Sequence, residues 1–232
     1  LAGDNGETRS WSRCHYKFRW WYEYSGGKLT DWGAHHVDIA TWALGKTETG
    51  PIRVIPEHVR HPVEFRDGFP VDPARYNTAT EFLIRAQFAD GVEIEIRHDG
   101  DNGILLEGTA GRIFVNRGTL AGKPVEELAS RPLKREDFRV YSNDNLDRVE
   151  RMGKIDAIKN HMGNFFDCTI GRKTPISDVV SQHRSVSLCH LGNIAMKVGT
   201  KLTWNPETEQ FADSPAASKL LKREQRKGFE IG

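Results

Sequence analysis

Residues 80–97 read TEFLIRAQFADGVEIEIR, and this stretch decides the fold. Residues 80–89 are rich in apolar side chains over the length of a strand, and residues 92–97 alternate apolar with charged side chains. Asp90 and Gly91 lie between the two segments, and an Asp-Gly pair is a strong signal for a tight hairpin turn. The stretch therefore predicts two antiparallel strands in a sheet with one face open to water or covered by a partner.

The segments on either side of this hairpin extend the pattern. Further strands are predicted at residues 52–59, 103–107, 112–116 and 201–204. No crossover helix is predicted between residues 52 and 116, so residues 103–116 are expected to continue one mainly antiparallel sheet. Two helices are predicted where apolar residues recur at helical spacing, about residues 154–170 and 178–199. The expected fold class is α+β, a mainly antiparallel open sheet with helices packed on one face.

The composition is typical of a soluble globular chain. Among 232 residues, 38% are hydrophobic and 28% charged, which is enough apolar surface for one sizeable core. Basic and acidic residues nearly cancel, at 33 against 32, so the charge balance does not favour binding to nucleic acid or to a membrane. Small neutral ligands fit this balance better. The three cysteines are an odd number at wide spacing, which argues against a disulfide framework or a zinc ribbon.

The chain is expected to divide into three parts. Residues 1–14 are interpreted as a remnant or flexible N-terminal segment, residues 15–210 as the α+β domain, and residues 211–232 as a polar C-terminal tail with solvated basic side chains. The first residue is Leu1 rather than Met, and we find neither a secretory signal nor a long apolar run. We therefore expect a fragment or a processed product, either cytoplasmic or exported.

A helix of about thirteen residues is predicted from Trp32 to Leu44. Thr30 and Asp31 precede it, and either side chain can cap its N-terminus. Gly45 follows it and can end it. This helix carries the residues most suited to chemistry.

Three polar residues, Asp31, His35 and Asp38, lie at i, i+4 and i+7 and therefore share one face of that helix. A carboxylate one turn before an imidazole can fix the tautomer of the ring and raise its basicity, which suits the histidine to exchange a proton with a substrate hydroxyl. The preceding Gly26 and Gly27 would let the backbone approach a ligand closely. The same spacing also fits a helix cap, a surface histidine and a structural acceptor, and spacing alone favours that structural interpretation.

The motif resembles a known family signature. It consists of Gly26-Gly27 followed by Asp31-x-Gly33-x-His35-x-x-Asp38, then Trp42 and Gly45. This pattern resembles the start of the C-terminal domain in the Gfo/Idh/MocA oxidoreductases, which include glucose-fructose oxidoreductase and inositol dehydrogenase. The closing portion, from Asn164-Phe165-Phe166 to Leu202-x-Trp204-Asn205-Pro206, also resembles members of this family. The resemblance covers about residues 15–210.

The resemblance implies a catalytic role for Asp31 and His35 as an acid/base pair. Structural support for the same helix would come from Gly26, Gly27, Gly33 and Asp38. In the family, a lysine from a Glu-Lys-Pro motif completes the site, and it belongs to an N-terminal Rossmann domain that binds NAD or NADP. This sequence contains neither that motif nor a Gly-x-Gly-x-x-Gly after a strand. The cofactor domain is therefore expected to lie outside this chain, and the chain alone is expected to be inactive.

Four further residues are predicted to bind substrate: Arg19, Tyr24, His36 and His190. Aromatic faces pack on the C–H surfaces of sugars while polar groups bond the hydroxyls. Packing in the core or between subunits explains the aromatic segment that includes Tyr24 equally well. A zinc site at His35 and His36 is disfavoured because adjacent histidines point to different sides of a helix, and no metal is expected.

The resemblance further implies a carbohydrate or cyclitol substrate and a homo-oligomer formed through the free face of the sheet. Two other functions remain open. Some family members cleave glycosidic bonds through transient oxidation by tightly held NAD, and such an enzyme would release free sugar without a net change in cofactor. An isolated domain can also serve as a dimerisation or carbohydrate-binding module, which would tolerate the loss of Asp31 and His35.

Overall fold

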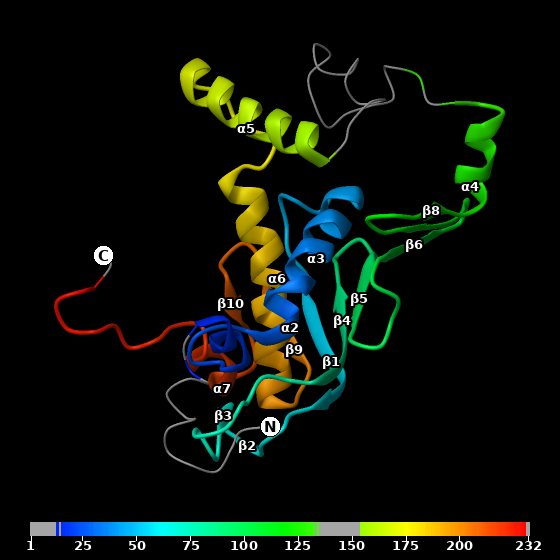
Figure 1. The fold of residues 1–232 in the computed structure, drawn as a ribbon. Helices are drawn as coiled ribbons and strands as arrows, with labels where there is room; N and C mark the ends of the chain where they lie inside the picture. The colour runs from blue at the N-terminus through cyan, green and yellow to red at the C-terminus, as the bar shows by residue number, and fades with distance from the viewer. Residues whose placement is uncertain (1–12, 14, 133, 135–153, 231–232) are drawn as a thin grey trace. The chain divides into compact units, whose positions relative to one another are not determined.

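The computed structural model describes residues 13, 15–132, 134 and 154–230. The chain forms two compact units, of which the first comprises Leu1–Asp101 with His183–Gly232 and the second comprises Asn102–Gln182 (Figure 1). The predicted N-terminal segment 1–14 lies, except for Arg13, outside the described residues.

A five-stranded sheet forms the centre of the first unit, with strand order β10-β9-β1-β4-β5 and antiparallel pairing throughout. Its strands are β1 (Arg53–Arg60), β4 (Glu81–Gln87), β5 (Glu93–Arg97), β9 (Leu202–Asn205) and β10 (Gln210–Phe211). The predicted hairpin joins β4 to β5, and Gly91 has a φ of 84° in the turn. That left-handed conformation is the reason a glycine suits this position.

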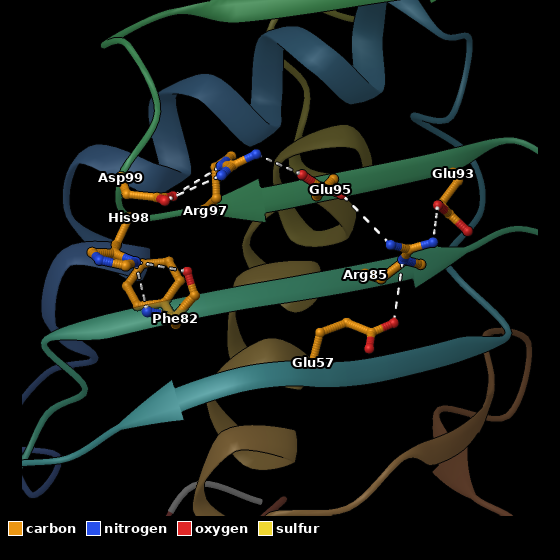
Figure 2. Close-up of polar contacts among 8 residues, drawn as sticks. All are labelled: Glu57, Phe82, Arg85, Glu93, Glu95, Arg97, His98 and Asp99. Carbon is orange, nitrogen blue, oxygen red and sulfur yellow. Dashed lines mark hydrogen bonds and ion pairs between the residues drawn. The ribbon is translucent and has the colours of Figure 1, made fainter.

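Helices cover one face of this sheet, as expected from the sequence. The two main ones are α3 (Trp32–Ala43) and α6 (Val179–Val198), which lie behind the strands in Figure 2. Alternate residues of β4 (Phe82, Ile84 and Ala86) are buried on the helix side. Other large buried side chains of the core are Trp21, Leu29, Val54, Leu188, Leu191 and Leu202. The predicted α+β class, with a mainly antiparallel sheet and helices on one face, is confirmed.

The opposite face of the sheet carries a network of ion pairs instead of helices (Figure 2). Arg85 of β4 lies 3.4 Å from Glu57, 3.2 Å from Glu93 and 3.7 Å from Glu95. Glu95 also pairs with Arg97, at 3.3 Å. Partly exposed pairs of this kind contribute about 0–1 kcal/mol each. They explain the charged positions in the alternating pattern of β5.

The second unit has a sheet of its own. It consists of β6 (Ile104–Gly108), β7 (Gly111–Val115) and β8 (Leu120–Ala121), followed by α4 (Lys123–Glu126) and η2 (Glu127–Ala129). The expectation that residues 103–116 continue the larger sheet is therefore wrong. Periodicity identifies a strand but not its partner, and the Thr109-Ala110 turn pairs β6 with β7. The unit also contains α5 (Lys154–Gly171).

The remaining elements of the first unit are short: η1 (His15–Trp20), α2 (Gly27–Thr30), β2 (Phe65–Arg66), β3 (Phe69–Pro70) and α7 (Pro215–Lys219). In the segment predicted as a polar tail, Phe211 and Ala217 are buried. Ser214 caps α7, since its hydroxyl accepts a hydrogen bond from the Ala217 amide at 3.2 Å. The first part of that segment is thus packed structure.

Candidate functional site

Two short helices meet at Asp31, the first residue of the predicted site. α2 ends and α3 begins there, and the φ and ψ angles of Asp31 are −90° and −95°. Its backbone N–H donates to the carbonyl of Gly27, but its side chain makes no capping hydrogen bond. The carboxylate is therefore left for another partner at the N-terminus of α3, where the helix dipole favours a negative charge.

That partner is Arg19 of η1. Its guanidinium donates to Asp31 Oδ2 at 2.7 Å, and both side chains are about one-third exposed. An ion pair this accessible to water adds little to stability. Its main effect is geometric, because it fixes the carboxylate and an adjacent cation at the start of the helix.

His35 and His36 are the next site residues along α3. The ring of Trp32 lies edge-on to His35, with 6.2 Å between ring centroids, and stacks with His36 at 6.5 Å. The His35 side chain is exposed and the His36 side chain is half-buried. The expected hydrogen bond from His35 to Asp31 is not present among the described contacts. The carboxylate pairs with Arg19 instead.

An exposed apolar stripe surrounds His35 on α3. Trp32, Ile39 and Trp42 are 49%, 44% and 50% exposed and, together with His35, follow the spacing of one helix face. Three large apolar side chains on a solvent-exposed face are unusual beside an ionisable ring. Such a face suits contact with a ligand that has both C–H surfaces and hydroxyl groups.

Asp38 faces the other way, toward α6. Ser185 donates a hydrogen bond to Asp38 Oδ1 at 2.8 Å, and the Ser185 and Thr41 hydroxyl oxygens lie 3.1 Å apart. Ser185 and Thr41 are buried. The hydrogen bond of Asp38 thus links α3 to α6 and fixes the position of the helix that carries His35.

The glycine pair at the start of α2 packs against Thr78, which precedes β4, and against Asn193 of α6. Gly27 has a φ of 68°, and a Cβ there would lie 2.7 Å from the Cβ of buried Thr78. The carbonyl of Gly26 accepts a hydrogen bond from Asn193 Nδ2 at 3.0 Å. Gly33 packs against Leu29, because a Cβ at this position would lie 3.2 Å from Leu29 Cδ1. A side chain at Gly26 or Gly27 would collide with its neighbours and one at Gly33 would be crowded, so glycine suits the backbone path into the site at all three positions.

A buried polar network, which the sequence does not predict, holds this entry segment. Tyr22 Oη donates to Asn193 Oδ1 at 3.4 Å and accepts from the Ala79 amide at 3.2 Å. The Tyr22 amide donates to Asn77 Oδ1 at 2.8 Å. Burial raises the pKa of Tyr22 well above its ordinary value, so the phenol stays protonated. One residue could have indicated this network from the sequence: Asn193, a polar residue among apolar ones on α6.

The remaining predicted substrate-binding residues are Tyr24 and His190. Tyr24 is 52% exposed, and the His190 side chain is also exposed. Within the described residues, neither forms a hydrogen bond, ion pair or ring contact with Asp31 or His35. Partial desolvation and the positive charge of Arg223 lower the pKa of His190, so its ring favours the neutral form.

The described residues contain neither a metal-binding cluster nor a membrane-spanning helix. No group of three or more His, Cys, Asp or Glu side chains is placed to hold a metal ion. No helix in the described part of the chain is long and apolar enough to cross a bilayer.

Comparison with known proteins identifies the family. A family model described as the oxidoreductase family, C-terminal alpha/beta domain, matches residues 6–132 and 133–231. A comparison with curated proteins gave no match. The family match covers nearly the whole sequence and agrees with the α+β architecture and with the motif around Asp31. The chain therefore belongs to the Gfo/Idh/MocA oxidoreductase family, as its C-terminal alpha/beta domain.

Proposed function

We propose that this chain is the substrate-binding domain of an NAD- or NADP-dependent oxidoreductase that acts on a secondary alcohol of a sugar or cyclitol. The observation that carries the proposal is the arrangement at the start of α3. An exposed imidazole, His35, lies one turn beyond Asp31, which Arg19 holds at 2.7 Å. The exposed ring of Trp32 lies beside the imidazole. An ionisable group beside an exposed aromatic face suits a polyhydroxylated substrate.

In this proposal, His35 takes the hydroxyl proton of the substrate during oxidation and returns it during reduction. An imidazole suits this task because its ordinary pKa lies close to neutral pH. Asp31 and Arg19 would contact neighbouring hydroxyls, with the carboxylate accepting hydrogen bonds and the guanidinium donating them. Trp32 would pack on the C–H face of the ring. The four side chains together would orient one carbon atom for reaction.

The described residues do not fit a dinucleotide. The sheets are antiparallel, and the described part of the chain has no glycine-rich turn from a parallel strand into a helix. We therefore assign the nicotinamide cofactor, which accepts or donates hydride, to a separate nucleotide-binding domain of the complete enzyme. The residues of this chain would supply substrate binding and proton exchange.

The test is turnover by the complete enzyme. Its reduction of NAD or NADP, followed by absorbance, is measured with a panel of neutral sugars and cyclitols, and the isolated 232-residue chain serves as the control. Cofactor reduction by the complete enzyme and none by the isolated chain is the expected result. Release of free sugar without net cofactor reduction would instead identify a glycosidase. Sugar binding without either reaction would identify a binding module.

We also propose that the helix-free face of the large sheet mediates self-association. Arg85 forms ion pairs with its acidic neighbours on this face, and the half-buried Leu83 lies on the same side of β4. A charge at Leu83 should disrupt such an interface. The oligomeric mass from light scattering should fall for Leu83→Asp and stay unchanged for the surface control Lys201→Asp. An unchanged mass for Leu83→Asp would contradict this interface.

A further inference from the structure

Lys197, in the last turn of α6, has an unusual environment. Its Nζ atom lies 5.3 Å from the ring centroid of Tyr22 and 5.6 Å from that of Phe69. In the described part of the chain it has no hydrogen-bond acceptor and no carboxylate within ion-pair distance. Lys46, by contrast, pairs with Asp90. The half-buried amine of Lys197 is thus held between two aromatic rings without a counterion.

The charged groups around Lys197 disfavour its protonated form. Arg223, in the C-terminal segment, donates hydrogen bonds to the carbonyls of Tyr22 and Glu23 and so places a fixed positive charge nearby. The Glu23 carboxylate offsets this charge in part, although it accepts hydrogen bonds from Asn77 Nδ2 at 2.9 and 3.2 Å. Burial and the charge of Arg223 lower the pKa of Lys197 to about 8.

His61, on the segment before β2, completes the surroundings. Its Nε2 lies 3.3 Å from Tyr22 Oη, and its ring packs on Phe65 at 4.3 Å between centroids. Burial and the positive charge of Lys197 lower the pKa of His61 to about 4, so the ring is neutral at physiological pH. The His61 ring therefore carries no charge beside the lysine.

We propose that Lys197 is a site of N-acylation by small anionic acyl donors of the acyl phosphate class. The free amine attacks the carbonyl carbon, a C–N bond forms, and the C–O bond to phosphate breaks. Inorganic phosphate leaves and the nitrogen loses one proton to water, so no oxidant or reductant is needed. The positive charge of Arg223 attracts the anionic donor, and Lys197 is half-buried rather than fully enclosed.

The free-amine fraction sets the expected selectivity. At about pH 7.5, an amine with a pKa of about 8 is about one-quarter free base, against about 0.1% for an ordinary lysine. A less basic amine is also a weaker nucleophile, and the two rings crowd it. We therefore expect Lys197 to react at least about tenfold faster than the exposed Lys201 four residues later.

The experiment uses this chain and acetyl phosphate, with the acetylation rate of each lysine measured by mass spectrometry of peptides between about pH 6.5 and 10. The rate at Lys197 should reach half its plateau near pH 8, and below that pH it should exceed the rate at the exposed Lys201. In denaturant the two lysines should react equally, which controls for peptide detection. A Lys197 rate that equals that of Lys201 throughout, or no reaction at Lys197, would overturn the proposal.

A pair of variants tests the cause. Arg223→Gln removes the nearby charge while keeping an amide donor for the two carbonyls, and should raise the pH midpoint at Lys197 by about half a unit or more. Arg226→Gln changes an exposed arginine in the same segment and should leave the midpoint unchanged. Equal midpoints in the two variants would refute the role given to Arg223. The comparison of Lys197 with Lys201 in the wild-type chain stands even if a variant fails to fold.

Discussion

Replacement of Gly27 by alanine tests whether the backbone path into the site is as tightly constrained as the structure indicates. Two costs are expected. A φ of 68° is unfavourable for a residue with a Cβ by about 1–2 kcal/mol. The new Cβ would also lie 2.7 Å from the Cβ of Thr78, which is buried and whose amide donates to the Trp20 carbonyl. Overpacking of that kind costs about 1–3 kcal/mol, so Gly27→Ala should lower the free energy of unfolding by about 2–5 kcal/mol.

Gly45→Ala is the matched control. Gly45 has a φ of 66°, but a Cβ there would have no atom within 4 Å. It should show the backbone cost alone, about 1–2 kcal/mol. Urea unfolding followed by tryptophan fluorescence measures both variants, because the five tryptophans among the described residues belong to the first unit. Equal destabilisation by the two variants, within about 0.5 kcal/mol, would refute the steric argument.

Three further predictions concern the same unit. Ser185→Ala removes the donor to Asp38 and should lower the free energy of unfolding in urea by about 1–3 kcal/mol, whereas no change would show that the tie between α3 and α6 is dispensable. His61 has a pKa of about 4 in the folded chain against 6.5 in the unfolded chain. Its contribution to the free energy of unfolding is therefore complete above about pH 6.5 and is lost as pH falls toward 4. The loss should reach about 1–2 kcal/mol in urea titrations and be absent in His61→Asn, and a parallel pH dependence in both proteins would contradict it. Arg19→Gln should weaken sugar binding by the complete enzyme about tenfold or more while its unfolding midpoint changes little, and the reverse pattern would make the pair with Asp31 purely structural.

Local signals predicted the helices and strands well. The Asp90-Gly91 pair predicted the hairpin between β4 and β5, and Gly91 adopts a φ of 84° there. Gly45 predicted the end of α3, which stops at Ala43 with Gly45 at a φ of 66°. Each of these signals depends on backbone conformation within a few residues, and such effects can be recognised from sequence.

Tertiary partners were not predictable in the same way. The strands at residues 104–115 form a separate sheet, although their pattern equally suits an extension of the larger one. Apolar residues at helical spacing predicted the helix at about residues 154–170, yet four of them, Met162, Phe165, Phe166 and Ile170, are 45–83% exposed on α5. Periodicity specifies which residues share a face, but it does not specify what covers that face.

At the candidate site, too, local structure was predictable from the sequence but contacts between elements were not. The spacing predicted that Asp31, His35 and Asp38 share one helix face. In the structure Asp31 precedes α3 and its carboxylate pairs with Arg19, whereas Asp38 accepts a hydrogen bond from Ser185 of α6. Arg19 comes from a different element, and side-chain pairing between elements depends on how they pack. Asn193 was missed for the same reason, because its role depends on contact with the Gly26 carbonyl 167 residues earlier.

The most direct test of the proposed function is the kcat/KM of the complete enzyme carrying His35→Gln. Loss of a group that transfers a proton should lower kcat/KM by about 10²–10⁴-fold. His183→Gln is the control, since this exposed histidine pairs with Glu209, and its kcat/KM should stay within about twofold of the wild type. A large loss for His35→Gln alone is the predicted result. Equal kcat/KM values for the two variants would contradict the assignment of His35 as the acid/base residue.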